Sequence, residues 1–106
     1  MNVQEIQQKV DEWISVHGGY WPPLSMLAAI IEELGEVARE INAINGPKVK
    51  KTPEDDLAKL KEELADLLFA LICMNNYYQI DMEAEILAVL SKYEQRDASR
   101  FTSLDE

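Results

Sequence analysis

The hydrophobic pattern of the chain is helical. Apolar residues recur three and four positions apart in four segments, and no stretch alternates apolar and polar residues as a strand would. Two breaks rich in glycine or proline, HGGYWPP at residues 17–23 and NGP at residues 45–47, interrupt the pattern. The predicted helices cover residues 2–16, residues 24 or 25 to the NGP break, residues 53–78 and residues 82–96. Four helices with short connections predict an all-α fold, an antiparallel four-helix bundle.

The predicted helix ends carry recognisable signals. Thr52 stands before Pro53 as a candidate cap, with acidic residues in the turn that follows. Asp81 is placed to cap the fourth helix. Residues 97–106 show little periodicity and predict a weakly structured tail. The length of 106 residues predicts a single domain covering residues 1–106.

The third predicted helix is apolar on nearly every side. Its segment KEELADLLFALICM, residues 61–74, still contains the carboxylate of Asp66. A helix of this kind is buried on more than one side, and in so short a chain part of its surface should meet another subunit. We therefore expect oligomerisation to complete the bundle, with a symmetric homodimer as the commonest arrangement.

Two pairs of carboxylates lie at helical spacing on neighbouring predicted helices. Glu33 and Glu36 are three residues apart, as are Glu63 and Asp66, so each pair shares a helix face beside the apolar stripe. If the two helices pack side by side, the four groups converge. Acidic pairs commonly form only a solvated helix face, but converging carboxylates in apolar surroundings require compensation by a cation or a proton.

A hard divalent cation is the compensation that the residue types favour. Arg39 falls on a different bearing from Glu33, and we expect Lys59 and Lys61 on the solvent side. Mg²⁺ prefers oxygen ligands and bridges carboxylates to phosphates, and Mn²⁺ is a possible substitute. One histidine and one cysteine cannot supply the usual zinc ligands. The sequence therefore predicts an Mg²⁺ site.

Composition and charge narrow the class of protein. Twenty acidic and ten basic residues give a formal net charge of −10, which argues against binding to nucleic acid through its phosphates. A single cysteine excludes an intramolecular disulfide and fits a reducing compartment. The N-terminus does not resemble a secretory signal, and the longest apolar run is much shorter than the roughly 20 residues of a membrane span. We expect a soluble cytoplasmic protein.

The spacing of the carboxylates also carries a family resemblance. Glu32-Glu33-x-x-Glu36, followed after residues 37–62 by Glu63-x-x-Asp66, resembles the EExxE…ExxD signature of MazG-type nucleotide pyrophosphohydrolases. That all-α superfamily includes dimeric dUTPases and phosphoribosyl-ATP pyrophosphatase. The resemblance implies Mg²⁺-dependent hydrolysis of a nucleoside triphosphate to a monophosphate and pyrophosphate. It also implies a dimer or a dimer of dimers, with active sites near the subunit interfaces.

Residue roles follow from this resemblance. Glu33, Glu36, Glu63 and Asp66 match the family's metal ligands. Glu32 matches the first position of the motif and is expected to orient water or to bind through water, so Glu32, Glu33 and Glu63 form the expected catalytic set.

Basic residues near the C-terminus are candidates for phosphate binding. Lys92, Arg96 and Arg100 resemble the family's C-terminal basic segment and are expected to contact phosphate oxygens. The alternative is that they are ordinary cations at the end of a helix. The loop lysines Lys48, Lys50 and Lys51 offer a weaker alternative for attracting phosphate.

Candidates for recognition of the base lie near the first break. Trp13 fits an apolar stripe and is expected in the core, whereas Tyr20 and Trp21 are placed to stack on a base. Asn76, or its neighbour Asn75, is expected either to contact a base edge or ribose or to form hydrogen bonds within the bundle.

Other functions stay open from the sequence. Within the enzyme class, the alternatives to housekeeping of the nucleotide pool are dUTPase and phosphoribosyl-ATP pyrophosphatase activity. Outside it, the alternatives are an acidic helical interaction module and a regulator that binds metal or nucleotide without turnover.

Overall fold

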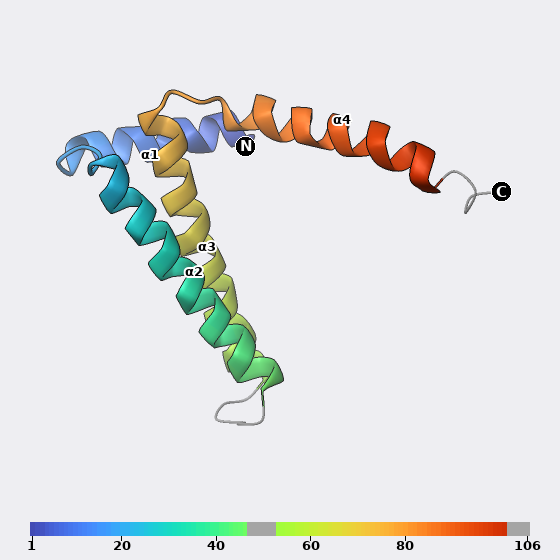
Figure 1. Cartoon of the computed structure of the whole chain (residues 1–106). Coiled ribbons are helices and arrows are strands. Elements are labelled where there is room, and N and C mark those ends of the chain that lie inside the picture. Colours follow the sequence, from blue (N-terminus) through green and yellow to red (C-terminus); the bar gives the residue numbers. More distant parts are fainter. Residues whose placement is uncertain (47–52, 102–106) are drawn as a thin grey trace.

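The chain forms four helices connected by short segments (Figure 1). A computed structural model describes the backbone of residues 1–46 and 53–101, and the side chains of residues 1–46 and 54–96. The helices are α1 (Val3–Val16), α2 (Pro23–Asn45), α3 (Pro53–Tyr77) and α4 (Met82–Phe101). The described residues contain no strand. The all-α, four-helix prediction is confirmed; the predicted cap Thr52 and the loop lysines Lys48, Lys50 and Lys51 lie outside the described residues.

Local sequence signals set most of the helix ends. Asn2 and Glu5 form a capping box at the start of α1, in which Asn2 Oδ1 accepts a hydrogen bond from the Glu5 amide at 2.8 Å. Gly18 and Gly19 follow α1 with φ values of +106° and +84°, a region that glycine enters without steric penalty. Asp81 Oδ1 accepts from the Ala84 amide at 3.2 Å, so the predicted cap of α4 is confirmed.

The fourth helix is longer than predicted. We expected it to end near residue 96 and residues 97–106 to form a weakly structured tail, but α4 continues to Phe101. Asp97-Ala98-Ser99-Arg100 contains no glycine or proline, and alanine and arginine are good helix formers. The absence of an apolar stripe in this segment was therefore a poor guide to where the helix ends.

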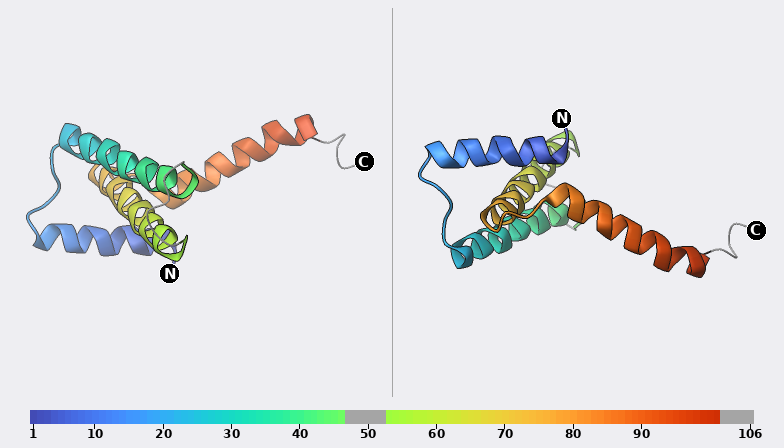
Figure 2. Two further views of the ribbon diagram at one scale, coloured as in Figure 1. Left: turned by 90° about the horizontal axis from the view of Figure 1, so that it is seen from below. Right: turned by 90° about the horizontal axis from the view of Figure 1, so that it is seen from above.

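The helices do not close into a compact bundle within one chain. Helices α2 and α3 run antiparallel, side by side, whereas α1 crosses them near one end and α4 leads away from that end in every view (Figures 1 and 2). Many apolar side chains consequently stay exposed, including Leu64 and Leu68 of α3 and Leu87 and Leu90 of α4, each 47–59% exposed. The predicted burial of α3 on several sides is not achieved by this chain alone.

A buried polar clamp attaches α1 to the end of α3. The Gln7 side-chain amide donates to Asn76 Oδ1 and to the Ile80 carbonyl, each at 2.9 Å, and its oxygen accepts from the Met82 amide at 3.0 Å. Asn76 Nδ2 donates in return to the Gln7 carbonyl at 2.9 Å. Gln7 is 7% exposed, so these bonds satisfy groups that would be costly to bury alone. These hydrogen bonds fix the position of α1 relative to α3 and to the turn that follows α3.

No helix in the described part of the chain is both long enough and apolar enough to cross a bilayer.

Candidate functional site

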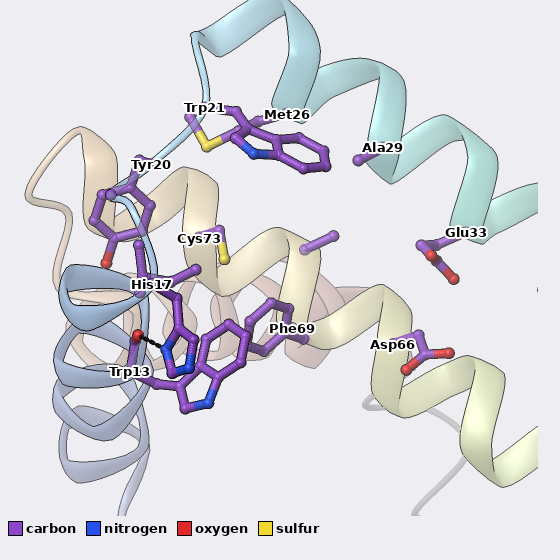
Figure 3. Close-up of a pocket in the computed structure, with 13 residues that line it drawn as sticks. Trp13, His17, Tyr20, Trp21, Met26, Ala29, Glu33, Asp66, Phe69 and Cys73 are labelled. Carbon is purple, nitrogen blue, oxygen red and sulfur yellow. Dashed lines mark hydrogen bonds between the residues drawn. The ribbon is translucent and has the colours of Figure 1, made fainter.

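Three carboxylates meet where α2 packs against α3. Oxygen atoms of Glu33, Glu63 and Asp66 lie within 4.8 Å of one another, and we call these three residues the acidic cluster. Glu63 and Asp66 are one turn apart on α3, and the antiparallel neighbour α2 brings Glu33 to them. Figure 3 shows Glu33 and Asp66 facing each other from the two helices. The predicted convergence of carboxylates thus occurs for three of the four expected metal ligands.

The three groups differ in exposure. Glu63 is buried at 6% exposure and Glu33 is half-buried. Asp66 is exposed in this chain, contrary to the expectation that apolar residues enclose it. The prediction took α3 as buried on several sides, whereas a single chain covers only the side that faces α2 and α1.

Electrostatic repulsion within the cluster affects the pKa of Glu33. Partial burial, followed by the negative charges of Asp66, Glu63, Glu32 and Glu36, raises the pKa of Glu33 above its ordinary value of 4.5. The charged form is therefore disfavoured in the metal-free protein. A bound cation would reverse this effect, because it stabilises the ionised carboxylate.

Glu36 lies outside the acidic cluster. Its carboxylate instead forms an ion pair with Arg39, one turn along α2. The expectation that Glu36 joins the other three ligands is not met by this arrangement, because a neighbouring guanidinium compensates its charge. Glu32, the expected water-orienting residue, is exposed on α2 beside the cluster.

Lys59, which we expected on the solvent side of α3, contacts the acidic cluster. Lys59 Nζ lies 3.2 Å from Glu63 Oε1 and 3.8 Å from Glu62 Oε2. The hydrogen bond to Glu63, together with the charges of Glu62 and Glu63, raises the pKa of Lys59. Lysine and glutamate four residues apart on a helix are neighbours, so the spacing alone could have identified this pair.

The donor set of the acidic cluster fits a hard divalent cation. It consists of carboxylate oxygens from Glu33, Glu63 and Asp66, and no histidine or cysteine belongs to it among the described residues. Oxygen ligands suit Mg²⁺ and Mn²⁺, whereas zinc sites favour nitrogen and sulfur. Three carboxylates held on two helices can therefore bind such a cation with water completing its shell.

A pocket of about 500 Å³ adjoins the acidic cluster. Glu33 and Asp66 line one end, and the rest of its wall is largely apolar or aromatic, including Trp13, His17, Tyr20, Trp21, Met26, Phe69, Ala70 and Cys73. Trp21 and Met26 lie on one wall, and Trp13 and Phe69 on the opposite one (Figure 3). An apolar cavity that ends in charged oxygens can hold a ligand with a flat ring at one end and an anionic, metal-bound group at the other.

Trp13 belongs to this pocket and not to the core. We expected it to be buried, but it is 53% exposed, with its ring stacked on His17 at 4.1 Å and edge-on to Phe69 at 6.0 Å. The prediction was wrong because the side of α1 that carries Trp13 faces a cavity near the crossing with α3. Trp21 lines the same pocket and is 63% exposed.

Other pocket residues were not identified from the sequence as candidates for ligand binding. Phe69 and Cys73 follow Asp66 at intervals of three and seven residues, and therefore share a face of α3 with it. Similar spacing relates Trp13 on α1 to His17, the residue that follows the end of α1. Burial raises the pKa of the Cys73 thiol.

Tyr20, also in the pocket wall, is anchored by Asp11. Its hydroxyl donates to Asp11 Oδ1 at 2.6 Å. Burial and this hydrogen bond raise the pKa of Tyr20 to about 12. The phenol is therefore a fixed neutral part of the pocket.

The remaining predicted binding residues lie elsewhere. The Asn76 side chain forms hydrogen bonds with Gln7 in the clamp. Of the two roles expected for Asn76, this is hydrogen bonding within the bundle and not contact with a base. Lys92 and Arg96 flank the Tyr93 ring at 5.4 and 4.8 Å on α4, the helix that leads away from the acidic cluster (Figure 1). The Arg100 side chain lies outside the described residues. A single chain therefore does not bring Lys92 or Arg96 to the carboxylates.

Known proteins resemble the chain over most of its length. Residues 22–101 match the MazG nucleotide pyrophosphohydrolase domain. The uncharacterized protein YpjD of Bacillus subtilis (strain 168) is 42% identical over 105 residues, which cover 98% of this chain and 94% of that protein.

Solved structures agree with the sequence comparison. The Bacillus-conserved MazG protein, a nucleotide pyrophosphohydrolase, superposes with a TM-score of 0.76 at 36% identity, covering 88% of this chain and 90% of the other. The YpjD structure from Bacillus subtilis gives a TM-score of 0.79 at 41% identity, covering 88% and 95%. The iMazG structure from Vibrio DAT 722 gives 0.59 at 28% identity, covering 87% and 99%.

Proposed function

Because this chain belongs to the MazG nucleotide pyrophosphohydrolase family, it is a hydrolase that acts on nucleotides, and we propose that it is an Mg²⁺-dependent nucleoside triphosphate pyrophosphohydrolase. The reaction converts a ribo- or deoxyribonucleoside triphosphate and water to the monophosphate and pyrophosphate, as housekeeping of the cytoplasmic nucleotide pool. The observation that supports it most strongly is the acidic cluster at one end of a pocket with aromatic walls.

The acidic cluster holds the cation in this proposal. Glu33, Glu63 and Asp66 supply carboxylate oxygens, and Glu36 joins them after its carboxylate leaves Arg39. Bound Mg²⁺ offsets the repulsion between this acidic site and a triphosphate, and stabilises negative charge on the leaving pyrophosphate.

The carboxylates also direct water. In this proposal Glu32, which is exposed and precedes Glu33 on α2, orients an attacking water molecule. Glu33 or Glu63 accepts its proton.

The aromatic end of the pocket binds the base. Trp21 and Trp13 stand on opposite walls, and either ring can stack on a nucleobase. Base–aromatic stacking contributes about 1–3 kcal/mol in nucleic-acid complexes and depends little on the identity of the base. The pocket therefore favours nucleotides over inorganic polyphosphates.

A homo-oligomer completes the fold and the phosphate site. The apolar residues exposed on α3 and α4 need a second copy of the chain, in a homodimer or homotetramer. Since α4 leads away from the acidic cluster of its own chain, Lys92, Arg96 and Arg100 contact phosphates only at the site of a partner copy. Size-exclusion chromatography with light scattering should detect at least a dimer; a monomer at micromolar concentration would contradict the proposal.

Pyrophosphate release is the direct test of the activity. The wild type is screened on ribo-, deoxyribo- and modified nucleoside triphosphates with and without Mg²⁺, beside Glu63→Ala and the control Glu12→Ala on α1. We expect turnover only with Mg²⁺, its loss in Glu63→Ala and its retention in the control. Equal turnover by the two variants would show that the site is wrongly assigned, and binding without release of pyrophosphate would identify a non-catalytic regulator.

A further inference from the structure

Lys59 contacts the acidic cluster. Its ammonium nitrogen is 3.2 Å from Glu63 Oε1, and Glu63 is the most buried member of the acidic cluster. The two residues are four apart on α3, so the contact needs no movement between helices. The positively charged ammonium group of Lys59 therefore contacts the Glu63 carboxylate, which is one of the proposed ligands of the divalent cation.

We infer that Lys59 is a resident counter-cation of the acidic cluster, which must leave Glu63 before a divalent cation can bind there. This inference rests on the proposed metal site and adds to it a residue that sets the metal concentration at which the site fills. In the metal-free protein, Lys59 offsets part of the repulsion among the three carboxylates.

Charge and distance support competition instead of simultaneous binding. Mg²⁺ lies roughly 2.1 Å from a carboxylate oxygen. With Lys59 Nζ at 3.2 Å from a Glu63 oxygen, a cation bound to that oxygen would lie within about 5 Å of the ammonium. Two cations at that separation, shorter than the Debye length of about 8 Å at physiological ionic strength, still repel each other, although salt roughly halves the interaction. The lysine contact and the metal contact therefore weaken each other, and each must do so by the same factor.

The surroundings of Lys59 allow it to leave. Its side chain is 36% exposed, whereas that of Glu63 is 8% exposed, so the lysine is the mobile partner of the pair. Glu62 Oε2 lies 3.8 Å from the ammonium, and the Glu62 side chain is 64% exposed. Rotation about the flexible lysine stem can transfer the ammonium to Glu62 or to water.

The test measures Mg²⁺ binding without nucleotide. Lys59→Met keeps a long unbranched side chain but removes the charge, whereas Lys59→Arg keeps the charge. The control Lys61→Met removes the same charge from an exposed position two residues along α3. Isothermal titration calorimetry at fixed pH and ionic strength gives the Mg²⁺ Kd of each, and thermal unfolding in EDTA gives the stability of the metal-free form.

Competition predicts that Lys59→Met binds Mg²⁺ more tightly but is less stable in the absence of the metal. Its Mg²⁺ Kd should fall about tenfold relative to Lys61→Met, while its Tm in EDTA should fall by about 2–4 °C. Lys59→Arg should stay within about twofold of the wild-type Kd. A Kd that rises in Lys59→Met would show that the lysine positions Glu63 for the metal, and a Kd equal to that of Lys61→Met would show no coupling; either result overturns the inference.

Two further variants separate this inference from the proposed function. Glu63→Gln and Asp66→Asn should lose Mg²⁺ binding if the acidic cluster is the metal site. If they bind Mg²⁺ as the wild type does, the proposed site is wrong and the inference about Lys59 falls with it. If they lose binding while Lys59→Met matches Lys61→Met, only the inference about Lys59 is wrong.

Discussion

Replacing Asp66 by asparagine should stabilise the metal-free protein while destroying its metal site. Asp66 lies within 4.8 Å of both Glu33 and Glu63, and it is exposed, so a water-like dielectric constant applies to both pairs. At 4.8 Å each repulsion is worth about 0.9 kcal/mol in water. Screening at physiological ionic strength roughly halves the sum, to about 1 kcal/mol. For a domain of 106 residues this corresponds to an increase in Tm of about 4 °C in EDTA.

Magnesium should reverse the order of stability. A ligand that binds only the folded state raises Tm, so the wild type should gain with Mg²⁺ and Asp66→Asn should gain little. Thermal unfolding by circular dichroism, with and without Mg²⁺ at one protein concentration, measures both effects. Glu12→Gln on α1 removes the same charge outside the cluster and corrects for the net charge of −10. A lower Tm of Asp66→Asn in EDTA, relative to Glu12→Gln, would refute the electrostatic reasoning.

Three further outcomes are expected. Because the folded-state pKa of Glu33 is raised, its contribution to stability is present below the ordinary value of 4.5 and is lost as pH rises through the raised pKa. In EDTA, thermal unfolding at several pH values should therefore show the wild type gaining Tm relative to Glu33→Gln as pH is lowered from neutral toward 4.5. Gln7→Leu should lower the free energy of unfolding by about 2–4 kcal/mol in urea titrations, because it leaves three hydrogen-bonding partners unpaired, and the exposed control Gln8→Leu should change it by less than about 0.5 kcal/mol. Trp21→Ala should raise KM for nucleoside triphosphates about tenfold with kcat nearly unchanged, and Trp21→Phe should restore most of the loss; a fall in kcat alone would contradict a stacking role.

The secondary structure could be predicted because its causes are local. Helical periodicity, the breaks at residues 17–23 and 45–47, and the Asp81 cap gave all four helices within a few residues at most ends. The largest error was the end of α4, which continues to Phe101 because no glycine or proline interrupts the helix after residue 96.

The acidic cluster was predicted only in part. Spacing placed Glu63 and Asp66 on one face of a helix, and Glu33 and Glu36 on one face of another, because that depends on helix geometry alone. Which carboxylates meet depends on how α2 and α3 are aligned and on competing partners. Glu36 lies outside the cluster and pairs with Arg39, an ion pair that was not predicted.

The sequence by itself determined the helices, the acidic faces and the family, because each depends on residues close together in the chain or on a motif with fixed spacing. Only the tertiary structure decided that α1 crosses α3 to form a pocket beside the carboxylates, with Trp13 in its wall, and that α4 leads away from it. The physical reason is that crossing angles and helix directions follow from contacts between distant residues. The clamp between Gln7 and Asn76, 69 positions apart, is one such contact, and no local pattern encodes it.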